Sequence, residues 1–127
     1  MAGPFIFVAT NKIRDGKLPD ERRRAPEWVR FIQENEPRLI GFHEYLSADG
    51  AEAEFVQIHP DAASFEHHMR VLADQSYGGN LEGVTSIRVY GEPTPAIREM
   101  LSLAAGPDVP VTVLSEHLGG FTRGVPG

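Results

Sequence analysis

The sequence predicts an α+β fold, a ferredoxin-like βαββαβ sandwich with a C-terminal helix and strand, built as one domain over residues 1–127. Two observations lead to this prediction. Strand-like apolar runs are interrupted by two segments whose apolar residues recur at helical spacing. The length of 127 residues fits one domain, and 41% hydrophobic with 24% charged residues is an ordinary globular composition.

The first half of the predicted unit is a strand followed by a helix. Residues 4–13 contain the run FIFVAT, which is typical of a strand covered on both faces. Residues 18–36 place apolar side chains at i, i+3 and i+4, the pattern of a helix with one buried stripe. Pro26 lies inside this helix, so we expect a kink or a second helical start there.

The second half begins with a hairpin. Residues 38–47 and 52–59 alternate between apolar and polar side chains, and an Ala-Asp-Gly turn joins them. Residues 62–74 return to helical spacing, and residues 84–90 form a fourth strand. These segments complete the βαββαβ order.

A C-terminal extension follows the ferredoxin-like core of residues 4–92. A Thr-Pro pair, favoured at helix starts, opens a predicted helix over residues 94–104. Residues 109–118 read as a last strand, which completes the extension 93–118. Residues 119–127 are expected to form a loose tail.

This architecture leaves one face of the sheet uncovered, because both core helices pack on the other. Apolar side chains on the uncovered face, such as Ile6 and Val8, are unfavourable in water as one patch. A second copy of the chain would cover them by placing two sheets face to face. We therefore predict a homodimer.

The composition excludes several kinds of chemistry and partner. The chain has no cysteine, which removes disulfides, thiolate metal sites and a cysteine nucleophile, and which fits a cytoplasmic protein. A net charge of −6 argues against nucleic-acid binding, which needs a dense basic surface. No apolar run reaches the roughly 20 residues of a membrane span.

Four short segments resemble a known family: Asp-Gly-Lys at 15–17, Ala-Pro-Glu at 25–27, Asn-Glu-Pro at 35–37 and Ser-Ala-Asp-Gly at 47–50. Together with the order of elements, they resemble the antibiotic-biosynthesis-monooxygenase-like (putative quinol monooxygenase) family of dimeric α+β barrels, over about residues 4–92. The resemblance implies a pocket between helices and sheet in each subunit. It also implies a cofactor-independent monooxygenase-like activity on a small phenol or quinol, although many family members have no demonstrated activity.

Two histidines are the candidate catalytic residues. His68 falls in the apolar stripe of the predicted helix 62–74, and His59 ends the strand before it. With Tyr45 or Tyr90 nearby, they could hold a phenolic substrate and accept its proton, which makes the substrate electron-rich enough to reduce dioxygen. The alternative for each histidine is structural, a buried ring paired with a carbonyl group or water.

Three further residues are candidates for substrate binding. By its position in the first strand, Asn11 resembles the asparagine with which family oxygenases orient oxygen or substrate; alternatively it ends the strand. Tyr77 precedes a Gly-Gly pair and could cover the pocket. Trp28 could line the pocket, or could simply belong to the core.

No cofactor or metal is predicted. The family's haem-degrading branch needs a tryptophan where this chain has His68, and a haem-ligating histidine that the following residues lack. His67 and His68 are neighbours and cannot chelate one metal together. The other function that we consider is a non-catalytic homodimer of the same fold, which binds a small molecule or serves a structural role, so whether the protein is an enzyme stays open.

Overall fold

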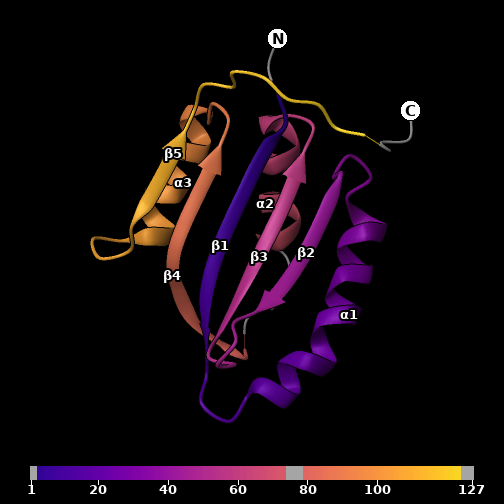
Figure 1. Ribbon diagram of the computed structural model, residues 1–127, viewed down its shortest axis with the longest axis vertical. Helices are drawn as coiled ribbons and strands as arrows, with labels where there is room; N and C mark the ends of the chain where they lie inside the picture. Colours follow the sequence, from indigo (N-terminus) through magenta and orange to yellow (C-terminus); the bar gives the residue numbers. More distant parts are fainter. Residues whose placement is uncertain (1–2, 74–78, 124–127) are drawn as a thin grey trace.

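The computed structural model describes residues 3–73 and 79–123 (Figure 1). In chain order the elements are β1 (Phe5–Ile13), α1 (Leu18–Asn35), β2 (Gly41–Leu46), β3 (Glu52–His59), α2 (Ala62–Ala73), β4 (Leu81–Tyr90), α3 (Pro95–Ala105) and β5 (Val111–Leu114). This order confirms the predicted α+β class, the βαββαβ unit and its helix-strand extension.

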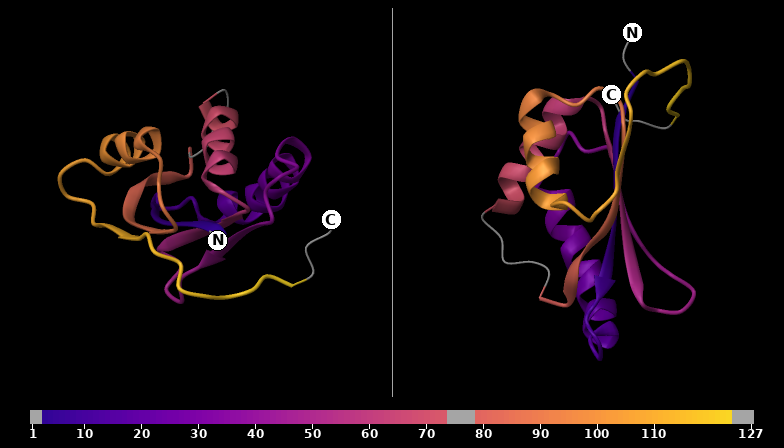
Figure 2. Two further views of the ribbon diagram at one scale, coloured as in Figure 1. Left: turned by 90° about the horizontal axis from the view of Figure 1, so that it is seen from above. Right: turned by 90° about the vertical axis from the view of Figure 1, so that its left-hand side faces the viewer.

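The strands form one sheet in the order β2-β3-β1-β4-β5. The pairs among β1 to β4 are antiparallel, whereas β5 joins the edge of β4 in parallel. The three helices cover the same face of the sheet (Figure 2). After β5 the chain crosses one end of the sheet on the side that the helices do not cover (Figure 2).

Several element boundaries differ from the prediction. β2 begins at Gly41 rather than at 38, although the backbone N–H of Ile40 already donates to the carbonyl of Ile58 on β3 at 2.8 Å. β4 begins at Leu81, three residues before the predicted start, and the last strand is confined to Val111–Leu114. α1 runs as one helix through the exposed Pro26, so no second helical start occurs there.

Strand register decides which side chains meet the helices. Phe7 lies opposite Gln57 on the face that the helices cover, and Phe7 packs against the main core. Val8 lies opposite Val56 on the other face, because successive residues of a strand alternate. We call this second face the open face; the apolar part of it comprises the partly exposed Ile6, Val8, Val56, Ile58 and Tyr90.

The C-terminal helix α3 belongs to the core of the domain. The side chain of Thr94 caps it by accepting the backbone N–H of Ile97 at 3.2 Å, as the Thr-Pro pair predicts. Its buried face joins the main hydrophobic cluster, whose members are Phe5, Ala9, Phe65, Ile87, Val89, Ile97, Leu101 and Ala105. The extension therefore completes the core of its own chain.

Two leucines of α3 provide a test of this role. Leu101 is 4% exposed and Leu103 is 80% exposed. Leu101→Ala should lower the free energy of unfolding by about 2–4 kcal/mol, because it leaves a cavity in the core. Leu103→Ala makes the same change on the same helix and should leave stability within about 0.5 kcal/mol. Urea unfolding measures both, and equal effects would contradict the placement of α3.

Candidate functional site

A cavity of about 120 Å³ lies between the sheet and the helices. All three helices contribute to its wall, together with strands β1 to β4. Its apolar lining includes Phe7, Phe42, Phe55, Met69, Leu72 and Met100. The side chains of Asn11, Gln57 and His68 add polar groups to this lining, and Trp28 adds its indole. Such a site binds a small, mostly apolar molecule and orients it through a few polar atoms.

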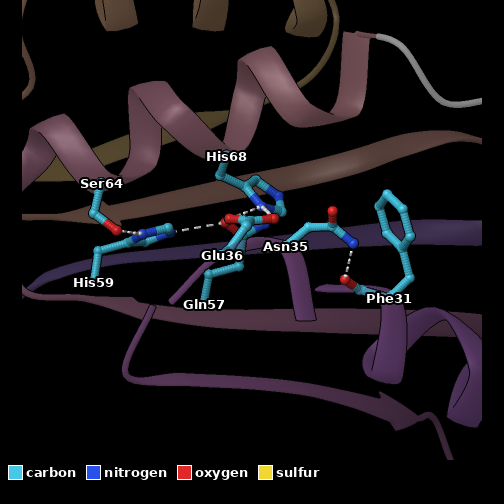
Figure 3. Close-up of polar contacts among 7 residues, drawn as sticks. All are labelled: Phe31, Asn35, Glu36, Gln57, His59, Ser64 and His68. Carbon is cyan, nitrogen blue, oxygen red and sulfur yellow. Dashed lines mark hydrogen bonds and ion pairs between the residues drawn. The ribbon is translucent and has the colours of Figure 1, made fainter. Parts of the chain in front are cut away.

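His68 of α2 is held by a carboxylate. Its Nδ1 lies 2.8 and 2.7 Å from the two carboxylate oxygens of Glu36, and the two residues are 1% and 3% exposed (Figure 3). An ionised carboxylate accepts hydrogen bonds, so Nδ1 carries the proton and Nε2 keeps its lone pair when the ring is neutral. Within the described residues Nε2 of His68 makes no hydrogen bond. Its lone pair can therefore accept a proton from a molecule in the cavity.

The end of α1 places Glu36 below α2. The backbone N–H of Glu36 donates to the carbonyl of Ile32 at 2.9 Å, and Pro37 cannot continue the helix. The Asn35 side chain donates to the carbonyl of Phe31 at 2.8 Å, which adds to this helix end (Figure 3). Glu36 lies in the Asn-Glu-Pro segment at 35–37, and nothing in that segment predicts a role in the site. A glutamate before a proline looks the same in sequence whether it is solvated or buried.

His59 belongs to a second buried chain of hydrogen bonds. Its Nδ1 lies 2.7 Å from Oγ of Ser64, and its Nε2 lies 3.0 Å from Oε1 of Gln57 (Figure 3). Burial, and to a smaller extent the neighbouring His68 at 5.9 Å between ring centroids, lower the pKa of His59 to about 3. His59 is therefore neutral near pH 7, and it reaches the cavity through Gln57, which is part of the lining.

The structure gathers part of the predicted site and separates the rest. Asn11 and Trp28 line the same cavity as His68. Tyr45 pairs with Glu54, and Tyr90 pairs with Ile6, so both tyrosines lie on the open face and not beside the histidines.

The expected grouping of a tyrosine with the two histidines thus does not form within the described part of the chain. The physical reason is the two-residue alternation of a strand, which sends Phe42 toward the helices and therefore Tyr45, three positions on, away from them. Tyr77 lies outside the described residues.

A carboxyl pair lies near Trp28. Arg24 donates to Glu21 through Nε and Nη2 at 2.9 and 3.0 Å, and the Asn80 side chain donates to Glu21 at 3.1 Å. Burial, together with the hydrogen bond to Glu21 and its charge, raises the pKa of Glu44 to about 8. Burial opposes ionisation of Glu21 as well, but hydrogen bonds from Arg24 and Glu44 hold its pKa below the usual value.

This pair therefore shares one proton at neutral pH, with Glu44 as its carrier. The guanidinium of Arg24 lies 5.4 Å from the Trp28 ring centroid, which connects the pair to the cavity wall. This pair could not be predicted, because a single sequence does not show that two glutamates from different elements meet.

The described residues contain no group of three or more His, Asp or Glu side chains arranged to hold a metal ion. Within the same residues, no helix is long and apolar enough to cross a membrane.

The fold and the site define a class: α+β proteins with a ferredoxin-like sheet and a small cavity beneath the helices. No family model and no curated protein sequence match this chain. Among solved structures it is similar to MupZ from Pseudomonas fluorescens, with 13% identity, a TM-score of 0.71 and 95% of each chain covered. It is also similar to protein SO0527 from Shewanella oneidensis, with 19% identity, a TM-score of 0.54 and coverage of 69% of this chain and 89% of that one.

A protein from Bacteroides thetaiotaomicron, provisionally named an antibiotic biosynthesis monooxygenase, superposes with 11% identity and a TM-score of 0.48 over 68% of this chain and 85% of that one. The similarities to MupZ and SO0527, at 13% and 19% identity, establish the fold and nothing beyond it.

The carboxyl pair predicts an unusual pH dependence of stability. The folded protein keeps a proton on Glu44 up to about pH 8, whereas the unfolded chain releases it near pH 4.5. The native state binds more protons in this window, so Glu44 makes the unfolding free energy fall as the pH rises from 5 to 8.

Glu44→Gln should remove this decline and stabilise the protein by about 1–2 kcal/mol at pH 8, allowing for partial exposure of the site. Glu34→Gln, on the exposed face of α1, is the matched control and should leave the decline in place. Urea unfolding at each pH measures the effect. Parallel curves for wild type and Glu44→Gln would refute the shared proton.

Proposed function

We propose that this protein is a cofactor-independent monooxygenase that acts on a small phenol or quinol. The observation that carries this proposal is a buried histidine, His68, whose Nδ1 is held by Glu36 while its Nε2 is available to an apolar cavity. A positioned base of this kind is what ionises a phenolic hydroxyl near neutral pH.

The size of the cavity limits a ligand to a single ring at most. A cavity of about 120 Å³ is somewhat smaller than the roughly 150 Å³ apolar cavity that accommodates benzene. The aromatic side chains Phe7, Phe42 and Phe55 line it and would contact the faces or edges of such a ring. A substituent with a polar atom would then meet the few polar groups of the wall.

The first step is transfer of the hydroxyl proton to Nε2 of His68. The imidazolium that forms is stabilised by the carboxylate of Glu36, which is already in contact with Nδ1 and needs no rearrangement. Once the proton arrives, the positive imidazolium of His68 and the negative carboxylate of Glu36 neutralise each other. The substrate becomes an electron-rich anion.

The second step passes an electron from this anion to dioxygen, after which the two radicals combine and form a carbon–oxygen bond. The oxygen–oxygen bond then breaks and one oxygen stays on the ring. The other oxygen leaves as water, with the proton from His68 and the proton lost from the ring carbon that has been oxygenated. A phenol becomes a quinone, and a quinol becomes a hydroxyquinone. The substrate supplies all of the electrons, so no external reductant is needed. Asn11, in the cavity wall, would orient oxygen or substrate.

The open face supports the proposal that two chains associate. Its apolar half contains Ile6, Val8, Val56 and Ile58 in adjacent positions on β1 and β3, all of them partly exposed. Its other half is polar, with Thr10 donating to Glu54 at 2.9 Å and Lys12 paired with Glu82 at 3.0 Å. A second copy placed over the apolar half would remove it from water.

A binding protein without catalysis uses the same fold and cavity. What favours it is the predominance of apolar side chains in the lining, which suits retention of a small hydrophobic molecule. The two functions are separated by whether a bound aromatic ligand is chemically changed in air.

The oxygenase proposal predicts that His68→Gln lowers oxygen consumption on a panel of phenols and quinols by at least about 100-fold, because the base is lost. Glu36→Gln should lower the rate less and should change the pH profile, since it removes the partner that stabilises the imidazolium. Oxygen-electrode measurements with product analysis by mass spectrometry give both results.

His67→Gln is the matched control, because the neighbouring histidine is exposed and should retain activity. Circular dichroism confirms that each variant is folded. If the wild type and His68→Gln turn over substrate at the same rate, His68 is not the base. If the wild type turns over no compound of the panel, the binding protein is favoured.

The association proposal predicts a dimer mass in light scattering at micromolar concentration. Val8→Glu places a charge in the middle of the apolar half and should give monomers. Leu103→Glu introduces the same charge on the exposed side of α3 and should leave the dimer intact. A monomeric wild type would show that the open face has another role.

A further inference from the structure

We propose that Gln57 is the hydrogen-bond donor of the central cavity, and that its amide nitrogen and Nε2 of His68 together bind one hydroxyl oxygen of the ligand. This inference deepens the proposed function and rests on it for the identity of the cavity as a substrate site. It assigns the ligand class as an aromatic compound with a free hydroxyl group.

The Gln57 amide turns its Oε1 toward the ring of His59, and this orientation decides which nitrogen of His59 carries the proton. Oε1 of Gln57 can only accept, so Nε2 of His59 carries a proton and donates it. The ring is neutral, because burial lowers the pKa of His59 to about 3, so its Nδ1 has no proton and accepts from the hydroxyl of Ser64. The chain of donors thus runs from Ser64 through His59 to Gln57 (Figure 3).

This direction leaves the amide nitrogen of Gln57 for the cavity. Gln57 is 5% exposed, and strand register places it opposite Phe7 and Phe42, on the helix side of the sheet. Its side chain lines the cavity, and within the described residues its amide nitrogen makes no hydrogen bond. A donor that lines the cavity and makes no hydrogen bond to the described residues can bind a ligand oxygen at this point.

The cavity wall therefore offers two complementary polar atoms. Nε2 of His68 accepts a hydrogen bond, and the Gln57 amide donates one. A hydroxyl group satisfies both at once, because it donates to the first and accepts from the second. After proton transfer, the oxyanion accepts from both atoms, so Gln57 stabilises the charge that the first step creates.

Other substituents satisfy this pair less well. An ether oxygen accepts from Gln57 but gives His68 no proton, and a methyl group does neither. A carboxylate would enter a cavity whose wall carries no lysine or arginine among the described residues, with the anionic Glu36 directly behind His68. The geometry thus selects a phenolic hydroxyl over its methyl ether, its methyl analogue and a benzoate.

In this arrangement His59 and Ser64 are positioning residues. They do not line the cavity, and they act through the amide that they hold. Their contribution is to keep Oε1 turned away from the ligand. If the relay were broken, the amide could rotate and present its oxygen instead, which would compete with the ligand hydroxyl for a donor.

The experiment measures binding of phenol, anisole and toluene to the full chain by NMR titration in the absence of oxygen. Phenol should bind at least ten-fold more tightly than toluene, with anisole between them. Phenol should shift the side-chain amide signals of Gln57, and toluene should not. The ¹⁵N shifts of His59 should show a protonated Nε2 and an unprotonated Nδ1.

Gln57→Leu keeps the size of the side chain and removes the donor. It should lower the preference for phenol over toluene at least ten-fold and leave toluene binding unchanged or stronger. Gln33→Leu, on the exposed side of α1, is the matched control and should retain the preference. Ser64→Ala should reduce the preference in part and change the ¹⁵N signature of His59, whereas Ser64→Thr, which retains the hydroxyl, should restore both.

The wild-type titration decides the matter even where a variant fails to fold. Equal affinities for phenol and toluene, or amide signals of Gln57 that phenol leaves in place, would overturn the assignment. Phenol binding with the expected amide shifts but without oxygen consumption in air would keep the donor site and remove the oxygenase function. Oxygen consumption together with an unchanged preference for phenol in Gln57→Leu would keep the oxygenase function and remove the donor site.

Discussion

The contact between Glu36 and His68 is the interaction on which the arrangement of the site depends. It joins the end of α1 to the middle of α2, with both side chains almost fully buried. Neither partner could be buried alone without a large desolvation penalty, so the point at which α1 stops and the depth at which α2 packs are set together. The same contact orients the imidazole. Its free nitrogen faces the cavity as a consequence of how the two helices meet.

Periodicity explains how much of the fold could be predicted from the sequence. The element order followed from alternation and helical spacing, and β3 was placed with its observed bounds, Glu52–His59. Starts that depend on tertiary contacts were missed, such as that of β4, where residues 81–83 pair with β1 despite weak strand character. Proline 26 predicted a kink or a second helical start, and the second start does not occur, because α1 continues through this exposed position as one helix.

The site was predictable only where one residue carried its own signal. A histidine in an apolar helix stripe marked His68, and Asn11 and Trp28 reached the same cavity. Glu36 and Gln57 were missed, since a polar residue at a helix end or in an alternating strand is normally solvated. Tyr45 or Tyr90 was expected near the two histidines, whereas strand register sends both tyrosines to the open face. Pairings between elements carry this information, and a single sequence does not contain them.

Helix α3 lies outside the βαββαβ unit, yet Met100, Leu101 and Ala104 form part of the cavity wall. The polar groups of the site come instead from β1, β3, α2 and the end of α1. The polar groups that would react with a ligand and part of the apolar wall that limits its size thus come from different segments of the chain. Substitutions in α3 can enlarge or narrow the space for a ligand without moving the histidines, so a family of such proteins could diversify its ligands while one proton-accepting arrangement is kept.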